Sequence, residues 1–243
     1  MRIAMLSDVH GNRPAFEAVL AAIEASDAEE IWCLGDLVGY GAEPDECVAL
    51  ARERCDVCLA GNHDLVVTGD ILLSEFSSSA AEAARWTQET ISEESLAFLR
   101  SLEPADPDRE VGLYHGSPRD PVWEYVLSTW QADECLDLAK SRVCAVGHSH
   151  VALWFHRNTD GKVGGAQAAA GAECDLSAGE WLVNPGGVGQ PRDGDPRAAW
   201  LLLDTESWAA TWHRVQYPID EAAKAIAEAG LPRLLAERLY TGQ

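Results

Sequence analysis

Residues 2–25, RIAMLSDVHGNRPAFEAVLAAIEA, decide the fold class. An apolar run opens this stretch and stops at Ser7 and Asp8, a pattern typical of a short buried strand that ends in a polar turn. From Pro14 onward the apolar residues recur at helical spacing, as on one face of an amphipathic helix. Proline suits the first helical turn because the backbone N–H that it lacks would be unpaired there. The stretch therefore predicts a strand, a polar turn and a helix.

The following residues repeat this design. EEIWCLGD, residues 29–36, is a second apolar run that ends in polar residues, and a helix is predicted from about Asp45 to Arg54. VCLAGNHD, residues 57–64, is a third such run. Strands that alternate with helices in this way indicate an α/β domain with parallel strands. Ligands and catalytic groups in such sheets lie beyond the carboxyl ends of the strands, which is where all three polar clusters fall.

The rest of the chain contains no linker that would separate domains, so we expect a single domain over residues 1–243. Residues 73–102 read as helical with a break near Ser92, and a helical tail is predicted from about Asp220. Later strands are expected in EVGLYHG (110–116) and RVCAVGHSHVALWF (142–155, with a turn inside it), and hairpins in 157–180. The last strands, EWLVNPGG (180–187), AAWLLLD (198–204) and WAATWHRV (208–215), are expected to have mostly antiparallel neighbours.

The charge balance restricts the partners of the chain. With 18 basic and 40 acidic residues the formal net charge is −22, which repels extended nucleic acids and anionic membrane surfaces. Carboxylates that bind divalent cations would be neutralised locally, so a small phosphorylated substrate stays compatible with this charge. No apolar run approaches the ~18 residues of a membrane helix.

The seven cysteines indicate a reducing compartment. Their number is odd and they are scattered among apolar neighbours, which favours buried thiols in a cytoplasmic protein over a disulfide framework. Cys55 and Cys58 form a C-x-x-C pair, but no second pair lies at zinc-ribbon spacing. We therefore interpret them as core residues. The start of the chain lacks the longer apolar core of a secretory signal.

Five polar clusters follow apolar runs, and together they hold five of the seven histidines. Glycines beside most of them let the backbone turn sharply and approach a ligand closely. The clusters are Asp8-Val9-His10, Gly35-Asp36, Gly61-Asn62-His63-Asp64, His115-Gly116 and Gly147-His148-Ser149-His150.

These clusters offer a set of metal ligands. Apart from His63 and Asp64 they supply two aspartates, one asparagine and four histidines, too many for one four-coordinate zinc. The set suits two metals that share a bridging carboxylate. Mixed nitrogen and oxygen ligands favour Mn, Fe, Zn, Co or Ni over calcium. Two ions about 3.5–4 Å apart can clamp the attacking and leaving oxygens of a phosphoryl displacement.

The ordered set D-x-H, G-D, G-N-H-D, H-G and G-H-x-H resembles the calcineurin-like metallophosphoesterase superfamily. Within it, SDVHGN and NPGGVGQPRDGDPRA resemble the compact bacterial and archaeal phosphodiesterases related to YfcE, and the likeness runs from about Arg2 to His213. The resemblance implies a four-layer α-β-β-α sandwich, in which two mixed sheets pack face to face with helices outside. It also implies two divalent transition-metal ions per chain, with manganese expected first and Fe, Zn, Ni or Co as alternatives.

The resemblance further implies a role for each motif residue. The first metal would be held by Asp8, His10, Asp36 and His150, and the second by Asp36, Asn62, His115 and His148. His63 would face the scissile phosphate and protonate the leaving oxygen, while Asp64 would orient His63. Asn12 would lie near the phosphate.

Three further residues are candidates for the pocket or its rim. Arg192 and Arg197 could reach a substrate phosphate, although ion pairs with the neighbouring Asp193 and Asp195 are equally compatible with the sequence. Tyr40 is close enough to Asp36 in sequence to line the pocket. It stands in GDLVGYG, where protein phosphatases and diadenosine tetraphosphate hydrolases usually read G-D-x-x-D-R-G, so neither of those activities is favoured.

The predicted function is hydrolysis of a small phosphodiester by a metal-bridging hydroxide, with His63 assisting the leaving group. A phosphomonoesterase or nucleotidase on the same site is the first alternative, and a non-catalytic scaffold of the same fold is the second. A nuclease is disfavoured by the charge. Substrate choice is expected to depend on loops 117–130 and 186–198, and the sequence predicts no oligomeric state.

Overall fold

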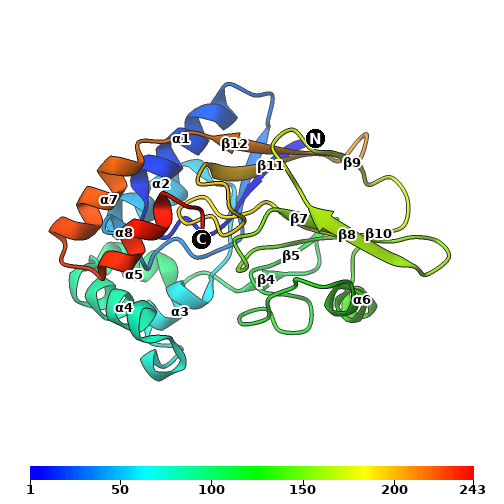
Figure 1. Cartoon of the computed structure of the whole chain (residues 1–243). Helices are drawn as coiled ribbons and strands as arrows, with labels where there is room; N and C mark the ends of the chain where they lie inside the picture. The colour runs from blue at the N-terminus through cyan, green and yellow to red at the C-terminus, as the bar shows by residue number, and fades with distance from the viewer.

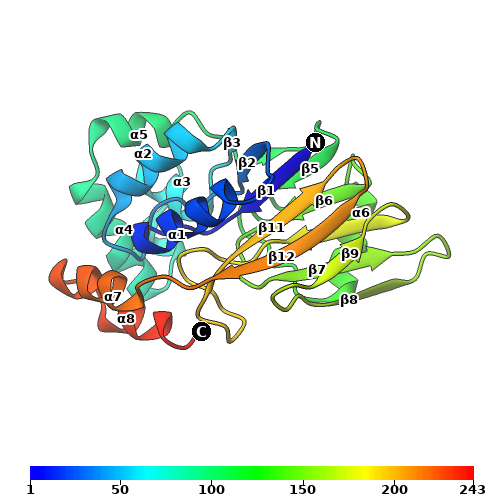
Figure 2. The same cartoon turned by 90° about the horizontal axis from the view of Figure 1, so that it is seen from above.

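The computed structural model describes all 243 residues, which form two mixed β-sheets of six strands each (Figures 1 and 2). Sheet A has the order β3-β2-β1-β11-β12-β9, and sheet B the order β4-β5-β6-β10-β7-β8. Sheet A consists of β1 (Arg2–Leu6), β2 (Glu30–Cys33), β3 (Val57–Cys58), β9 (Glu173–Asp175), β11 (Ala198–Asp204) and β12 (Ala209–Val215). Sheet B consists of β4 (Ala105–Asp106), β5 (Val111–Tyr114), β6 (Val143–Val146), β7 (Leu153–Arg157), β8 (Val163–Gln167) and β10 (Glu180–Asn184).

Helices cover the outer faces unequally. Helix α6 (Thr129–Leu138) alone packs on sheet B, while the other helices gather on the side of sheet A (Figures 1 and 2). Those are α1 (Arg13–Glu24), α2 (Pro44–Arg54), α3 (Asn62–Thr68), α4 (Ser78–Thr90), α5 (Glu93–Leu99), α7 (Ile219–Glu228) and α8 (Arg233–Leu239), with the 3₁₀ turn η1 (Leu73–Glu75).

Three clusters of buried hydrophobic side chains lie between the four layers of helices and sheets. The side chains of β1 alternate between two of them, because successive residues of a strand point to opposite faces. Ala4 and Leu6 face the helices together with Phe16, whereas Ile3 and Met5 pack between the two sheets. The third cluster joins sheet B to α6. The predicted α-β-β-α sandwich is confirmed.

The first half of the chain folds largely as its pattern predicts. β1, β2 and β3 are parallel and alternate with α1 and α2, although β3 has only two residues. The expected break near Ser92 is the start of α5, where the Ser92 hydroxyl accepts a hydrogen bond from the Ser95 N–H at 3.2 Å. β11 and β12 have antiparallel neighbours as predicted. β10 pairs antiparallel with β7 but also in parallel with β6. That pairing puts the end of β10 beside the histidine turn after β6.

The strand order brings the predicted polar clusters together. Parallel strands end at one edge of a sheet, so β1, β2 and β3 carry their clusters to one edge of sheet A, and β5 and β6 do the same in sheet B. Because the sheets pack face to face, the two edges meet. None of the helices combines the length and the apolar character that crossing a membrane requires.

Candidate metal centre

The first group of candidate ligands consists of Asp8, His10, Asp36 and His150. All four are buried, and each offers a ligand atom within 4.8 Å of the others. His10 Nε2 lies 3.4 Å from Asp36 Oδ2 and 3.1 Å from His150 Nε2, and His150 Nε2 lies 3.5 Å from Asp8 Oδ1. These are the residues that the resemblance assigns to the first metal.

The second group shares Asp36 with the first. Asp36, His115 and His148 offer atoms within 4.8 Å of one another. His115 Nε2 lies 3.6 Å from Asp36 Oδ2, 3.2 Å from His148 Nδ1 and 3.2 Å from Asn62 Oδ1. The structure thus brings all seven predicted ligands together in two groups joined at one carboxylate, as a bridged pair of metals requires.

Backbone carbonyls fix the orientation of every candidate ligand histidine. In each ring one nitrogen is placed to donate to a carbonyl oxygen, which leaves the lone pair of the other nitrogen directed into the cluster. The pairs are His10 Nδ1 with Val38 (3.0 Å), His115 Nδ1 with Leu34 (2.8 Å), His148 Nε2 with Trp123 (3.2 Å) and His150 Nδ1 with Gln190 (2.6 Å). Two of these lone pairs, on His10 and His150, face each other, an arrangement that a cation between them would stabilise.

The buried carboxylates also fit a cation. Both side-chain oxygens of Asp8, and Oδ2 of Asp36, are buried without a hydrogen-bond donor. Burial raises the pKa of Asp8 to about 7 and raises that of Asp36 well above its usual value. The same burial lowers the pKa of His10 and His150, which keeps their rings neutral. An unpaired buried anion is costly, so divalent cations would satisfy this donor set.

The backbone of the site is held in an uncommon conformation. Seven non-glycine residues of the chain have a left-handed φ, and six of them belong to the site. Such residues cost about 1–3 kcal/mol each and persist only where surrounding contacts enforce them, most often at functional sites. The six are Asp8, His10, Asp36, Tyr40, His148 and His150, with φ between 52° and 61°.

Gly61 is required by the close approach of two loops at this edge. A Cβ atom on Gly61 would lie 2.0 Å from Asp36 Oδ1 and 2.4 Å from the Asp36 backbone nitrogen. The same Oδ1 accepts a hydrogen bond from the His63 backbone N–H at 2.8 Å. The loop after β2 and the start of α3 are therefore packed directly on each other around the shared carboxylate.

His63 lies beside both groups and outside their ligand sets. Its ring centroid is 4.8 Å from that of His10 and 4.3 Å from that of Tyr40, and its Nδ1 atom has no hydrogen-bond partner. The prediction that Asp64 orients this ring is wrong. Both Asp64 oxygens are taken by backbone N–H groups, those of Gly61 (2.8 Å), Val38 (3.1 Å) and Leu37 (3.3 Å). Asp64 therefore ties the loop after β2 to α3.

The prediction for Asn12 is also wrong. Its side-chain oxygen caps α1 by accepting from the Ala15 N–H at 3.2 Å, and its amide donates to the Gly189 carbonyl at 2.8 Å. With these bonds made, the buried Asn12 side chain holds the first helix against loop 186–198. It is absent from the lining of the cavity that opens onto the two ligand groups.

That cavity has a volume of about 210 Å³ and is lined by Tyr40 and Arg192, as expected. The Arg192 guanidinium donates to the Tyr40 hydroxyl at 3.3 Å and to Gln190 Oε1 at 3.2 Å, while its buried Nε has no partner. No carboxylate forms a salt bridge with it. Six lining residues were not singled out from the sequence, namely Glu75, Phe76, Ser77, Ala80, Trp123 and Tyr125. The last two lie in loop 117–130, whereas no sequence signal marked Phe76.

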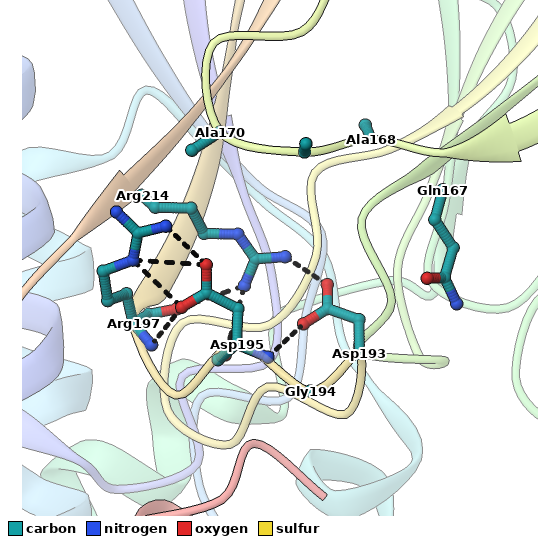
Figure 3. Close-up of a pocket in the computed structure, with 9 residues that line it drawn as sticks. Gln167, Ala168, Ala170, Asp193, Gly194, Asp195, Arg197 and Arg214 are labelled. Carbon is teal, nitrogen blue, oxygen red and sulfur yellow. Dashed lines mark hydrogen bonds and ion pairs between the residues drawn. The ribbon is translucent and has the colours of Figure 1, made fainter.

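A larger cavity of about 570 Å³ lies on the other side of loop 186–198 (Figure 3). Each arginine that lines this cavity forms a salt bridge with a carboxylate. Arg214 pairs with Asp193, and Arg197 pairs with Asp195 at 2.6 Å. Arg197 is therefore engaged in the ion pair that the sequence allowed as an alternative. Asp193 also accepts from the Ala152 N–H at 3.1 Å, so it anchors the loop that carries Arg192 next to the histidine turn.

Comparison with known proteins agrees with this geometry. A family model described as the calcineurin-like phosphoesterase superfamily domain matches residues 1–207. The chain belongs to this family. A curated relative, an uncharacterized protein of Methanocaldococcus jannaschii, is 36% identical over 99% of this chain and 98% of its own length. The family predicted from the sequence motifs is confirmed.

Solved structures show the same relationship. A metallophosphoesterase from Sphaerobacter thermophilus is 39% identical and superposes with a TM-score of 0.90 over 100% of this chain and 99% of its own. A hypothetical protein of Pyrococcus horikoshii, 19% identical, has the same fold, with a TM-score of 0.81 over 100% of this chain and 98% of its own. Calcineurin-like family membership and the joined Asp–His groups indicate a divalent metal centre suited to phosphoester hydrolysis.

Proposed function

We propose that this chain is a two-metal phosphodiesterase that hydrolyses small phosphodiesters. The observation that carries the proposal is the sharing of Asp36 by two buried ligand groups, directly beside a histidine that neither group uses. When bound, two cations would polarise the phosphoryl oxygens and lower the pKa of a water molecule between them. The mixed nitrogen and oxygen ligands suit Mn, Fe, Zn, Ni or Co, and of these we propose manganese.

His63 acts on the leaving group in this proposal. It lines the cavity, and no protein group forms a hydrogen bond with its ring. Its Nδ1 is buried beside Gly39, so Nε2 is the nitrogen that would face a substrate. An imidazole so placed can give a hydrogen bond, and then a proton, to the departing oxygen. Arg192 and Tyr40 lie across the same cavity, where the guanidinium would bind a non-bridging phosphate oxygen.

The charge of the cavity favours a diester over a monoester. Arg192 is the only lysine or arginine in its lining, and Glu75 adds a carboxylate at the wall. A phosphodiester brings one negative charge, whereas a monoester near neutral pH brings almost two, so the single guanidinium suits the diester better. The small cavity and the net charge of −22 also favour a small substrate over an extended nucleic acid. Seven free cysteines fit the cytoplasm, which we propose as its location.

The test compares bis-p-nitrophenyl phosphate with p-nitrophenyl phosphate on the manganese-loaded protein. We expect the diester to be hydrolysed faster. His63→Ala should lower turnover by about 10²–10⁴-fold while two metals per chain are retained. His213→Ala is the matched control, because His213 stacks on Trp200 away from the cavity. Faster turnover of the monoester would contradict the diesterase and indicate a phosphomonoesterase. If neither substrate is hydrolysed, the result would favour a non-catalytic scaffold protein.

A further inference from the structure

Four aromatic side chains line the cavity beside the two ligand groups. They come from three separate segments: Tyr40 follows β2, Phe76 precedes α4, and Trp123 and Tyr125 belong to loop 117–130. Tyr40 and Phe76 also pack partly against the hydrophobic core, but none of the four is fully buried, and Tyr125 is 42% exposed. Exposed aromatic surface that gathers at a concave site marks ligand binding more often than scattered exposure does.

The rings form a continuous wall that begins at His63. Phe76 meets the His63 ring edge to face at 4.9 Å between centroids, and it meets Trp123 in the same way at 5.3 Å. Tyr125 stacks flat on the imidazole of His148, with centroids 4.1 Å apart and planes 2° apart. Trp123 also meets His148 at 6.5 Å between centroids, so the wall extends from His63, at the leaving-group side, to His148. The esterified group of a substrate would lie along it.

Polar groups are placed next to this wall. Glu75 and Ser77 flank Phe76 in sequence, and both line the cavity. A carboxylate and a hydroxyl at the edge of a ring site can accept from and donate to the edge of a heterocycle. Stacking of a base on aromatic side chains contributes about 1–3 kcal/mol per base, so the flat faces favour a group that carries a planar ring.

We infer that the wall formed by Phe76, Trp123 and Tyr125 selects phosphoesters whose leaving group carries a planar aromatic ring. This inference rests on the proposed function and names the substrate class of the same site. The ring has two chemical sources, a nucleobase or a simple aryl group. The cavity of about 210 Å³ has room for a small group of this kind and not for a polymer.

Binding to the manganese-loaded protein tests this inference without turnover. Calorimetry would compare adenosine 5′-monophosphate, phenyl phosphate, ribose 5-phosphate and inorganic phosphate. We expect the two ligands with rings to bind about tenfold more tightly than the two without, as stacking of ~1.4 kcal/mol gives. Equal affinity for phenyl phosphate and the nucleotide would mean that contact with the ring face alone provides the gain in affinity. Tighter binding of the nucleotide than of phenyl phosphate would mean that Glu75 and Ser77 also contribute. Equal affinity of ribose 5-phosphate and the nucleotide would overturn the inference.

A matched pair of tryptophan variants locates the effect. Trp123→Leu should abolish the preference for ring-bearing ligands and leave the affinity for inorganic phosphate unchanged. The Trp123 carbonyl that holds His148 belongs to the backbone, so the variant should keep two metals. Trp130→Leu is the control, since Trp130 is 64% exposed outside the cavity, and it should change nothing. Loss of affinity for all four ligands in Trp123→Leu, or the same loss of preference in Trp130→Leu, would refute the inference.

The two proposals can fail separately. A protein that prefers ring-bearing ligands but hydrolyses no phosphoester would refute the proposed function and leave the ring selection standing. A protein that hydrolyses aryl and alkyl diesters with the same kcat/KM, and binds all four ligands alike, would refute the ring selection alone.

Discussion

Replacing Gly61 by alanine would push a methyl group into the shared carboxylate. The backbone angles of Gly61, φ −95° and ψ 175°, suit alanine, so the effect comes from contact alone. Its Cβ would lie 2.0 Å from Asp36 Oδ1, whereas ordinary contact begins near 3.4 Å, so the carboxylate must move by about 1.4 Å. Metal–ligand distances tolerate deviations of only about 0.2 Å. Both metals should therefore bind poorly, since both groups use Asp36.

The displacement should also disturb His63. Asp36 Oδ1 would no longer accept from the His63 N–H, a charge-assisted bond that contributes about 1.5–3 kcal/mol. We expect Gly61→Ala to retain fewer than one metal per chain by mass spectrometry. Its diesterase activity should fall by about 100-fold or more, because even changes to groups that only support a ligand cost 10–100-fold. Circular dichroism would verify folding.

Gly164→Ala provides the control for this experiment. Gly164 lies in β8, and a Cβ there would meet no atom within 4 Å, so metal content and activity should stay at wild-type levels. Two tightly held metals and unchanged activity in Gly61→Ala would refute the claim that the packing of α3 on the loop after β2 positions the shared carboxylate.

Three further predictions concern the groups around the centre. Asp64→Asn should lower the free energy of unfolding, measured in urea, by about 2–5 kcal/mol, because at least one backbone N–H donor loses its acceptor. A fall in kcat without a loss of stability would instead indicate a catalytic role for Asp64. Burial raises the pKa of Asp8 to about 7, so below that pH a metal ion must displace a proton from the carboxyl group. Calorimetry should therefore show weaker metal binding and more proton release at pH 6 than at pH 8. Identical affinity and proton release at the two pH values would contradict this prediction. Asp193→Asn should lower the free energy of unfolding by about 3 kcal/mol, because the salt bridge of Asp193 with Arg214 is buried. Asp195→Asn should lower it by less than about 1 kcal/mol, because the salt bridge of Asp195 with Arg197 is more exposed. Equal destabilisation of the two variants in thermal unfolding would contradict the role of Asp193 as a buried anchor of the loop.

The ligand groups could be predicted because their signals are local. Each polar cluster directly follows an apolar run, and the rule that parallel strands end at one edge is enough to bring such clusters together. The pairing of β10 with β6 was harder to foresee, because it depends on which of two sheets a late strand joins. His148 and His150, two residues apart in one turn, fall into different groups, as the family pattern implied.

The wrong assignments share a physical cause. Asp64 is adjacent to His63 in sequence, but its oxygens go to the three backbone N–H groups that α3 and the loop after β2 leave unpaired. Asn12 precedes Arg13-Pro14, which is itself a pattern for a helix N-cap, and the amide follows that local signal. The wall of Phe76, Trp123 and Tyr125 joins two segments that meet only in the folded chain. The sequence indicated loop 117–130 as a determinant of substrate choice, but it held no local sign of Phe76.

The most direct measurement is an anomalous difference map from crystals grown with Mn²⁺. The proposed centre predicts two peaks per chain, one among Asp8, His10 and His150 and one among Asn62, His115 and His148, with the carboxylate of Asp36 between them. A single peak, or no peak at these residues with Mn²⁺ in excess, would contradict a two-metal phosphoesterase.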